Sequence, residues 1–143
     1  MGARKRLRAE ELKAEKRQVV GAVLRNCPSS PRKMRLIADM VRGVEVNKAL
    51  GMLKFSKKHA SIDLEKLLKS AIANWESKNQ ADRKDLEDGK VYVKEICVDL
   101  GRVLKRISPA PQGRAYRIRK RSNHVSIVLD NKKVTETVTV KAA

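Results

Sequence analysis

The sequence predicts an α+β fold in which three helices pack on a small antiparallel sheet and a long β-hairpin protrudes. The first observation is that apolar residues recur at helical spacing in three segments between residues 31 and 79. The second is that residues 91–107 and 115–130 alternate as strands around a turn rich in proline. The third is that the stretch from Leu100 to Leu129 carries eight Lys or Arg residues and no acidic residue, which no protein core could hold.

The first part of this fold is one strand followed by one helix. Residues 19–24 form a short β-like run, which the turn N-C-P-S-S-P closes. Ser30 is expected to cap the next helix, with Pro31 in its first turn and Gly43 at its end. The expected core positions are Met34, Ile37, Ala38 and Val41, and the opposite side carries Arg32, Lys33, Arg35 and Arg42.

Two further helices precede the hairpin. The shorter one has Val46, Ala49, Leu50 and Leu53 on one side. Ser56 is expected to cap the longer one, whose continuous apolar stripe makes it the main core helix. The stripe consists of Leu64, Leu67, Leu68, Ala71, Ile72 and Trp75. Trp75 is therefore interpreted as a core residue, and His59, with no ligand partner nearby, as a solvated or capping imidazole. Residues 80–89 predict an acidic, solvent-facing loop.

The predicted hairpin is too long to stay within the body. Seven residues, 108–114, separate its strands, and seventeen residues at about 3.3 Å each give an arm of about 55 Å. A body of about 100 residues has a radius of gyration of only about 13 Å. The base is expected to pair within the domain, with Val91, Val93, Ile96 and Val98 against Val125, Ile127 and Leu129. The distal part, about residues 100–122, must project.

Charge and composition indicate a polyanionic partner. Of 143 residues, 34 are Lys or Arg and 16 are Asp or Glu, which gives a net charge of +18. Aromatic residues make up 3%, too few for a base-stacking platform. No glycine-rich phosphate loop, metal-ligand cluster or nucleophile–base pair is present, so we expect neither an enzyme nor a metal or other cofactor. Cys27 and Cys97 are interpreted as reduced thiols, with a disulfide as the alternative.

The chain is expected to form one domain, residues 18–130, with a basic extension at 1–17 and a tail at 131–143. The start lacks the apolar core of a signal peptide, and no apolar run approaches the roughly 20 residues of a membrane span, so we expect a cytoplasmic protein without a membrane partner. The extension is either a solvated basic helix or an arm laid on nucleic acid. The tail either adds a strand or is disordered.

Three motifs in order resemble one known family. They are S-P-R-K-M-R-L-I-A-D-M-V-R-G, L-L-K-S-A-I-A-N-W-E and L-K-R-I-S-P-A-P-Q-G-R-A-Y-R-I-R-K-R-S-N-H-V-S-I-V-L. Their order is similar to that of bacterial-type large-subunit ribosomal protein twenty-two over roughly residues 18–130. The resemblance implies a body near the exit of the nascent-peptide tunnel and a hairpin that runs through large-subunit ribosomal RNA to line the tunnel wall. It also implies contacts with several RNA domains, a role in early assembly, and ribosomal protein four and the nascent peptide as neighbours of the hairpin end.

The resemblance, together with the charge of the arm and the position of its turn, gives candidate residues. The candidates for RNA binding are Ser30, Pro31, Arg32, Lys33, Arg35, Arg102, Lys105, Arg106, Arg114, Arg117, Arg119, Lys120, Arg121 and His124. The candidates for a tunnel-lining tip are Pro109, Ala110, Pro111, Gln112, Gly113, Arg114 and Ala115. Arginine suits phosphate because its planar fork binds two oxygens at once. For His124 an RNA hydrogen bond and a packing role are equal alternatives, and Tyr116 either stacks on a base or packs against Ile118.

The tip departs from the family pattern, and a rival function stays open. Residues 110–112, Ala-Pro-Gln, are neutral where family members often carry basic residues, so stalling effects of basic tip residues are not carried over to this chain. The alternative function is an architectural DNA-binding protein whose proline-tipped arm, with Pro109 and Pro111, enters the minor groove.

Overall fold

The helices come first along the chain, apart from one short strand, and the two longest strands come last. The computed structural model describes residues 2–78 and 89–131. In these ranges the elements are α1 (Gly2–Gln18), β1 (Val20–Cys27), α2 (Pro31–Val41), α3 (Val46–Phe55), α4 (Ala60–Lys78), β2 (Val91–Pro109) and β3 (Ala115–Asn131). The predicted α+β fold is confirmed, with α1 as an additional helix in the N-terminal extension. The expected acidic loop and tail, apart from Gly89 and Asn131, lie outside the described residues.

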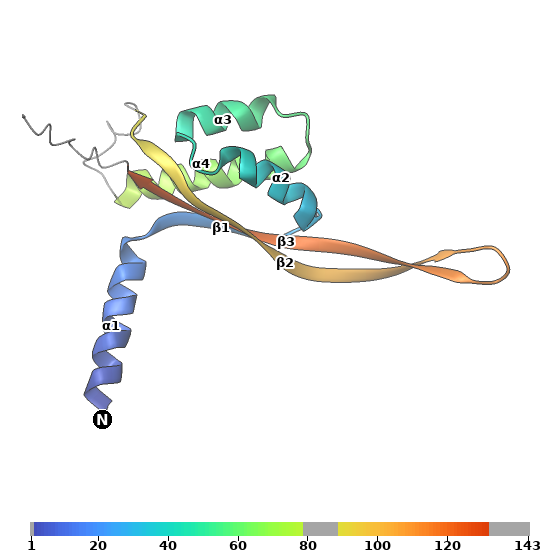
Figure 1. Cartoon of the computed structure of the whole chain (residues 1–143), viewed down its shortest axis with the longest axis horizontal. Coiled ribbons are helices and arrows are strands. Elements are labelled where there is room, and N and C mark those ends of the chain that lie inside the picture. Colours follow the sequence, from blue (N-terminus) through green and yellow to red (C-terminus); the bar gives the residue numbers. More distant parts are fainter. Residues whose placement is uncertain (1, 79–88, 132–143) are drawn as a thin grey trace, which may run out of the picture.

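The sheet has the order β1-β3-β2, and both pairings are antiparallel. β3 is therefore the central strand of the body (Figure 1). The predicted pairing of the hairpin base is confirmed, because Val93, Ile96 and Val98 lie opposite Leu129, Ile127 and Val125 in turn. Beyond the body, β2 and β3 continue together as a two-stranded arm that extends far from the helices (Figure 1).

Helices α2, α3 and α4 lie on one side of the sheet and enclose the core against it (Figure 1). The predicted core positions of α2 are all buried, and Trp75 on α4 is 5% exposed, so its assignment to the core is confirmed. Leu50 and Ile72 are only partly buried at the margin of the core. From β3, the side chains that enter this core are those of Val125, Ile127 and Leu129. Alternate residues of the strand therefore face the helices.

Two serines do not cap helices in the predicted way. Ser30 occupies the position before α2, but its side chain makes no capping hydrogen bond; Pro31 is the first helical residue, as predicted. Ser56 ends α3 instead of starting α4: its backbone N–H donates to the Leu53 carbonyl, and α4 begins only at Ala60. The backbone is extended at Ser56, and residues 56–59 connect the two helices. Gly43 follows α2 with a φ of +74°, as its predicted role at the helix end requires.

The turn of the hairpin is shorter than the sequence predicts. The strands pair as far as Pro109 opposite Ala115, which leaves five residues, 110–114, in place of seven. Ala110 N–H donates to the Arg114 carbonyl at 2.9 Å, so the ladder bonds fall on alternate pairs and the missing N–H of Pro109 costs no bond. Gln112 and Gly113 both have positive φ, 61° and 68°, which closes the turn tightly.

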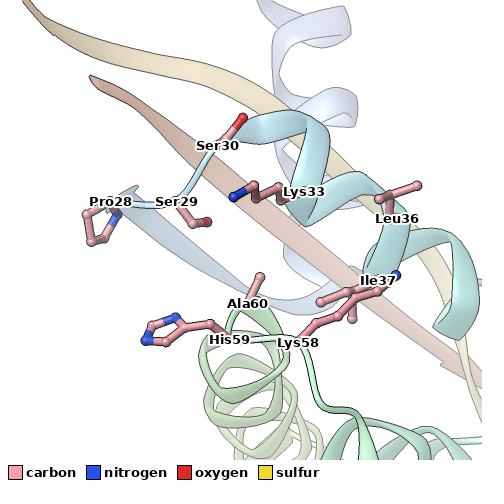
Figure 2. A pocket seen from close by; sticks show the side chains of 9 residues that line it. All are labelled: Pro28, Ser29, Ser30, Lys33, Leu36, Ile37, Lys58, His59 and Ala60. Atoms are coloured by element: carbon pink, nitrogen blue, oxygen red, sulfur yellow. The ribbon is translucent and has the colours of Figure 1, made fainter. Parts of the chain in front are cut away.

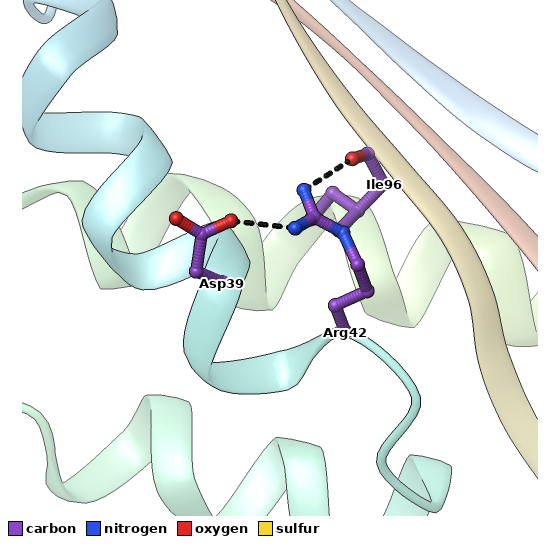
Figure 3. A network of polar contacts seen from close by, with 3 residues as sticks. All are labelled: Asp39, Arg42 and Ile96. Atoms are coloured by element: carbon purple, nitrogen blue, oxygen red, sulfur yellow. Dashed lines mark hydrogen bonds and ion pairs between the residues drawn. The ribbon is translucent and has the colours of Figure 1, made fainter.

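The outer edge of β2 is covered by α2 and the segment after it. Val93 N–H donates to the Val44 carbonyl at 3.0 Å, and Gly43 N–H donates to the Val93 carbonyl at 2.9 Å. Farther along the strand, Arg42 donates to the Ile96 carbonyl at 3.1 Å while its other nitrogen pairs with Asp39 at 2.7 Å (Figure 3). These contacts satisfy edge carbonyls that would otherwise need water or another strand.

Neither cysteine forms a disulfide in the structure. Cys27 is buried, and its thiol donates to a carboxylate oxygen of Asp63 at 3.3 Å; Cys97 is exposed on β2. Within residues 2–78 and 89–131, no helix is both long enough and apolar enough to cross a membrane.

The close approach of β1 to β3 depends on Gly21. A Cβ atom at this position would collide with the backbone carbonyl oxygen of Ile127. We predict that Gly21→Ala lowers the free energy of unfolding by about 1–3 kcal/mol, because the strand must shift to relieve the overlap. Urea unfolding measures the change.

Gly51 provides the matched control, because it lies inside α3 with no atom within 4 Å of the place that an added methyl group would take. Gly51→Ala is expected to raise the free energy of unfolding by about 0.5–1 kcal/mol, the helix-propensity difference between the residues. Equal stability of Gly21→Ala and the wild type would contradict the steric argument.

Candidate nucleic-acid interface

The arm consists of residues 102–121, and its register sorts the side chains onto two faces. Residues opposite each other in an antiparallel pair point to the same side, and successive pairs alternate. One face, here called the arginine face, consists of Val103, Lys105, Ile107, Arg117, Arg119 and Arg121. The other, the tyrosine face, consists of Leu104, Arg106, Ser108, Tyr116, Ile118 and Lys120. Arg117, Arg119 and Arg121, spaced two residues apart along β3, thus lie on a single face.

The arginine face continues the side of β3 that faces the helices. Leu129, Ile127 and Val125 are buried on that side, and two residues further Asn123 is fully buried. The next alternate position is Arg121, which is exposed and lies beyond the cover of the helices. One alternation along β3 thus supplies apolar side chains to the core and, past it, arginines to the surface.

Every Lys and Arg of the arm is exposed. On the arginine face Lys105 lies directly opposite Arg119, which places two positive charges side by side. Such a pair destabilises a ribbon, and no acidic residue between 100 and 129 offsets it. The arm therefore presents charge at the expense of its own stability, as expected of a surface that meets a polyanion.

The start of α2 meets the base of the arm in a pocket of about 430 Å³, here called the α2 pocket. It is lined by Ser30, Pro31, Arg32, Arg35, Leu100 and Arg121. Three of these residues, Arg32, Arg35 and Arg121, bring guanidinium groups to the pocket, although Arg121 lies about ninety positions after the other two. Arg35 is held in place because it donates to the Val98 carbonyl at 3.0 Å. Pro31 itself is buried, so its side chain shapes the helix start from within.

The α2 pocket is also where the backbone of α2 favours an anion. Met34 N–H makes the first helical bond, to the Ser30 carbonyl, so the N–H groups of Arg32 and Lys33 have no acceptor within the helix. Ser30 leaves them uncapped. The positive end of the helix dipole and three arginines thus converge on one hollow, a geometry suited to a phosphate group.

Lys33 points to the other side of the helix start. Figure 2 shows it in a second pocket of about 540 Å³, together with Ser29, Ser30, Lys58, His59 and Ala60. Leu36 and Ile37 supply an apolar wall there. Of the predicted RNA-binding cations of α2, Arg32 and Arg35 thus line one hollow and Lys33 the other, and His59, which is exposed, lies beside the second one.

Two side chains fix the arm to the body near the α2 pocket. Asn123 donates to the Ser29 carbonyl at 2.8 Å and to the Ser29 hydroxyl at 2.9 Å, which ties the segment before α2 to β3. His124 Nδ1 accepts the backbone N–H of Asn26 at 3.0 Å, opposite a bulge in β1. His124 therefore has a hydrogen-bond partner in the body. The roles of Asn123 and Ser29 are not predicted from the sequence. The available signal was Asn123 itself, a polar residue that continues the apolar alternation of the strand.

The remaining predicted residues lie along the arm and its end. Arg102 lies in a bulge of β2, where its carbonyl accepts the Ser122 hydroxyl at 2.6 Å. Arg106 and Lys120 lie on the tyrosine face, and Arg114 lies at the turn, all exposed. The tip residues Pro109, Pro111, Gln112, Gly113 and Ala115 are also exposed, and Ala110 is half-buried.

Three hydrogen-bonded ion pairs elsewhere on the body shift pKa values. A hydrogen bond to Glu45 raises the pKa of Lys48, and one to Asp130 raises the pKa of Lys94. A hydrogen bond from Lys69 lowers the pKa of Glu65. All three shifts favour the charged form, the opposite of what a catalytic acid or base at neutral pH requires. In the described residues, no three His, Cys, Asp or Glu side chains gather as metal ligands would.

Comparison with known proteins decides the family. Residues 22–130 match the family described as ribosomal protein L22p/L17e. The chain belongs to this family. It is 65% identical to large ribosomal subunit protein uL22 of Christiangramia forsetii over 129 residues, which covers 90% of this chain and 94% of that protein. The uL22 proteins of Porphyromonas gingivalis and Bacteroides fragilis are 61% and 57% identical over 130 and 136 residues, covering 91% and 95% of this chain and 95% and 98% of theirs.

Membership in the L22p/L17e family confirms the resemblance seen in the three sequence motifs. Proteins of this family are structural and not enzymatic, as the sequence predicts for this chain. The matched range ends just before the tail and begins inside β1, so it spans the three core helices, the arm and the α2 pocket but not α1.

The opposed charges of the arginine face give a testable effect on the free protein. We predict that Arg119→Thr stabilises the distal strand pairing by about 0.2–1 kcal/mol, because it removes the cation opposite Lys105. Amide hydrogen exchange of the free protein should show slower exchange in residues 103–107 and 117–121.

Lys120→Thr is the matched control. It removes the same charge from the adjacent position, but Lys120 lies opposite Leu104 on the tyrosine face, so little change is expected. If both substitutions slowed exchange equally, general charge reduction would explain the effect and the assignment of faces would be wrong.

Proposed function

We propose that the protein is a structural constituent of the large ribosomal subunit that binds ribosomal RNA through the arm and the start of α2. The observation that carries this proposal is the convergence of Arg32, Arg35 and Arg121 at the α2 pocket, continuous with the arginine face. A helix start and three guanidinium groups suit one phosphate, and the face beyond suits those that follow along an RNA backbone. The names of the relatives, large ribosomal subunit protein uL22, support the same assignment.

The position within the subunit is part of the proposal. The body lies near the opening of the peptide exit tunnel, and the arm runs through RNA to line the tunnel wall. Its partners are several domains of the large-subunit RNA, neighbouring proteins that include ribosomal protein four, and the nascent peptide. The protein acts early in subunit assembly and resides in the cytoplasm, within the ribosome. The support is the family resemblance together with an arm that extends far beyond the core (Figure 1).

The distribution of charge favours RNA over the architectural DNA alternative. A minor-groove arm inserts an apolar wedge and holds DNA with cations around it. Here residues 109–113 are uncharged. The cations lie instead on both faces of the stem and at the α2 pocket. A partner must therefore surround the arm on several sides, which folded RNA does and a duplex groove does not. The proline residues at the tip are accommodated by the turn geometry itself.

Salt dependence tests the phosphate contacts. If six to ten phosphates are neutralised, affinity for ribosomal RNA should fall by about 10³–10⁵ between roughly 50 and 200 mM salt. Filter binding or fluorescence anisotropy with deproteinised large-subunit RNA measures it. Bent duplex DNA serves as competitor: RNA binding that DNA displaces at equal concentration would support the alternative function, and a flat salt response would exclude both.

A pair of variants separates the stem of the arm from its tip. Replacing residues 109–115 by Asn-Gly keeps the pair Ser108–Tyr116 and supplies a two-residue turn. Subunit incorporation should stay largely intact, because Arg32, Arg35 and the stem cations remain, whereas antibiotic sensitivity or peptide stalling at the tunnel should change. Changing Arg117, Arg119 and Arg121 together to Ala should lower incorporation, since each charged hydrogen bond contributes roughly 1.5–3 kcal/mol.

Occupancy of each variant in purified large subunits gives the comparison. Circular dichroism confirms that both variants fold, because neither change touches the buried core. Loss of the tip variant from subunits, with retention of the triple arginine variant, would contradict the proposed division between stem and tip.

A further inference from the structure

Residues 3–14 of helix α1 have no core to stabilise them. Every residue from 3 to 14 is exposed, including Leu7 at 53% and Leu12 at 49%. Figure 1 shows the helix leaving the start of β1 and running away from the body, in a direction different from that of the arm. Most helical stability in proteins comes from packing of an apolar face, and an isolated helix of 17 residues is marginal in water.

The charges of α1 also oppose the helix in isolation. Its first turn has no acidic residue, and Arg4, Lys5, Arg6 and Arg8 gather where the dipole is positive. Arg6 pairs with Glu10 at 3.6 Å, but both side chains are more than 60% exposed, so the pair contributes little. A partner of negative charge would relieve this repulsion and occupy a surface that the body leaves open.

The charges of α1 are separated along the helix. The first two turns carry four cations and no acidic residue. From Glu10 on, three cations and three acidic residues balance each other. The density of positive charge is therefore highest in the first two turns, at the end of the helix away from the body (Figure 1). Leu7 and Leu12 point in different directions, so the helix has no apolar face for a membrane or a helical partner.

We propose that α1 is a second RNA-binding element, whose basic first two turns lie against backbone phosphates of a ribosomal RNA segment separate from the one that surrounds the arm. This inference rests on the proposed function. Helix α1 is about 25 Å long at 1.5 Å per residue and diverges from the arm, so the two elements reach different parts of the RNA. Two tethered contacts of this kind raise overall affinity through effective concentration, without any new contact in the body.

Two matched double variants test the proposal. Arg4→Gln with Arg8→Gln removes two charges from the first two turns, and Lys13→Gln with Lys16→Gln removes two from the later part of the helix, where cations and acidic residues balance. Glutamine keeps helix propensity, which circular dichroism verifies. The probe is deproteinised large-subunit ribosomal RNA from Christiangramia forsetii, whose uL22 protein is 65% identical to this chain. The slope of log affinity against log salt should fall by roughly 1.4–1.8 for the first variant and by much less for the second.

Each other outcome contradicts a defined part of the proposal. Equal changes in both variants would mean that only net charge matters, and no change in either would mean that α1 does not contact RNA. Unchanged RNA binding with reduced occupancy of the first variant in purified subunits would assign α1 to an acidic protein instead. If the proposed function itself were wrong, the wild-type chain would bind the RNA without steep salt dependence.

Discussion

The continuity of β3 is the constraint on which the rest of the structure depends. The strand runs from Ala115 to Asn131 and pairs with β2 over nearly its whole length, while only its proximal part is joined by β1. The helices give the proximal part its stability, because they cover the side that carries Val125, Ile127 and Leu129. The distal part takes its direction and register from the same strand, although no helix covers it. The position of each arm side chain is therefore set inside the core.

Helix α2 connects this strand system to the surface that we assign to RNA. Its buried side anchors it to the sheet, and Arg35 in the helix and Arg42 directly after it donate to carbonyls on the edge of β2. The same helix directs its uncapped start at the base of the arm, where Arg121 arrives from β3. Anchoring and the proposed anion binding thus use one rigid element, and the α2 pocket is already formed in the structure. Pre-organisation of this kind lowers the entropy lost on binding.

Local patterns are sufficient to predict most of the fold. Helical periodicity identifies α2, α3 and α4, and alternation identifies the hairpin and the pairing of its base, because these signals arise within one element. Ser56 is predicted at the wrong helix because a serine between two helices fits either end, and the tertiary connection decides. The turn is predicted too long because Pro109 resembles a break, although it occupies a strand position whose N–H is not needed.

The site is predictable in its residues but not in its grouping. Composition and resemblance select Arg32, Arg35 and Arg121, yet nothing local indicates that residues about ninety positions apart line one hollow. That grouping follows from the alternation of β3 continuing past the edge of α2. Asn123 escapes prediction for the same reason, since its partner Ser29 lies in a distant segment. The bulges in β1 and β2 also leave no clear mark on the sequence.

The bulge at the base of the arm limits how the length of the arm can vary. Between Leu100 and Val103, β2 carries one residue more than β3, and only this offset brings Lys105 and Ile107 onto the side occupied by Arg117, Arg119 and Arg121. A single-residue insertion or deletion beyond that point, in either strand, would exchange the two faces of that strand relative to the body. Insertions that add one residue to each strand would also turn the tip over. Length changes compatible with the present arrangement therefore come as two residues in each strand, a lengthening of about 6.6 Å at a time. Natural variants of this arm should therefore differ in length by two residues in each strand. Where they differ by one residue in each strand, a bulge should have been gained or lost.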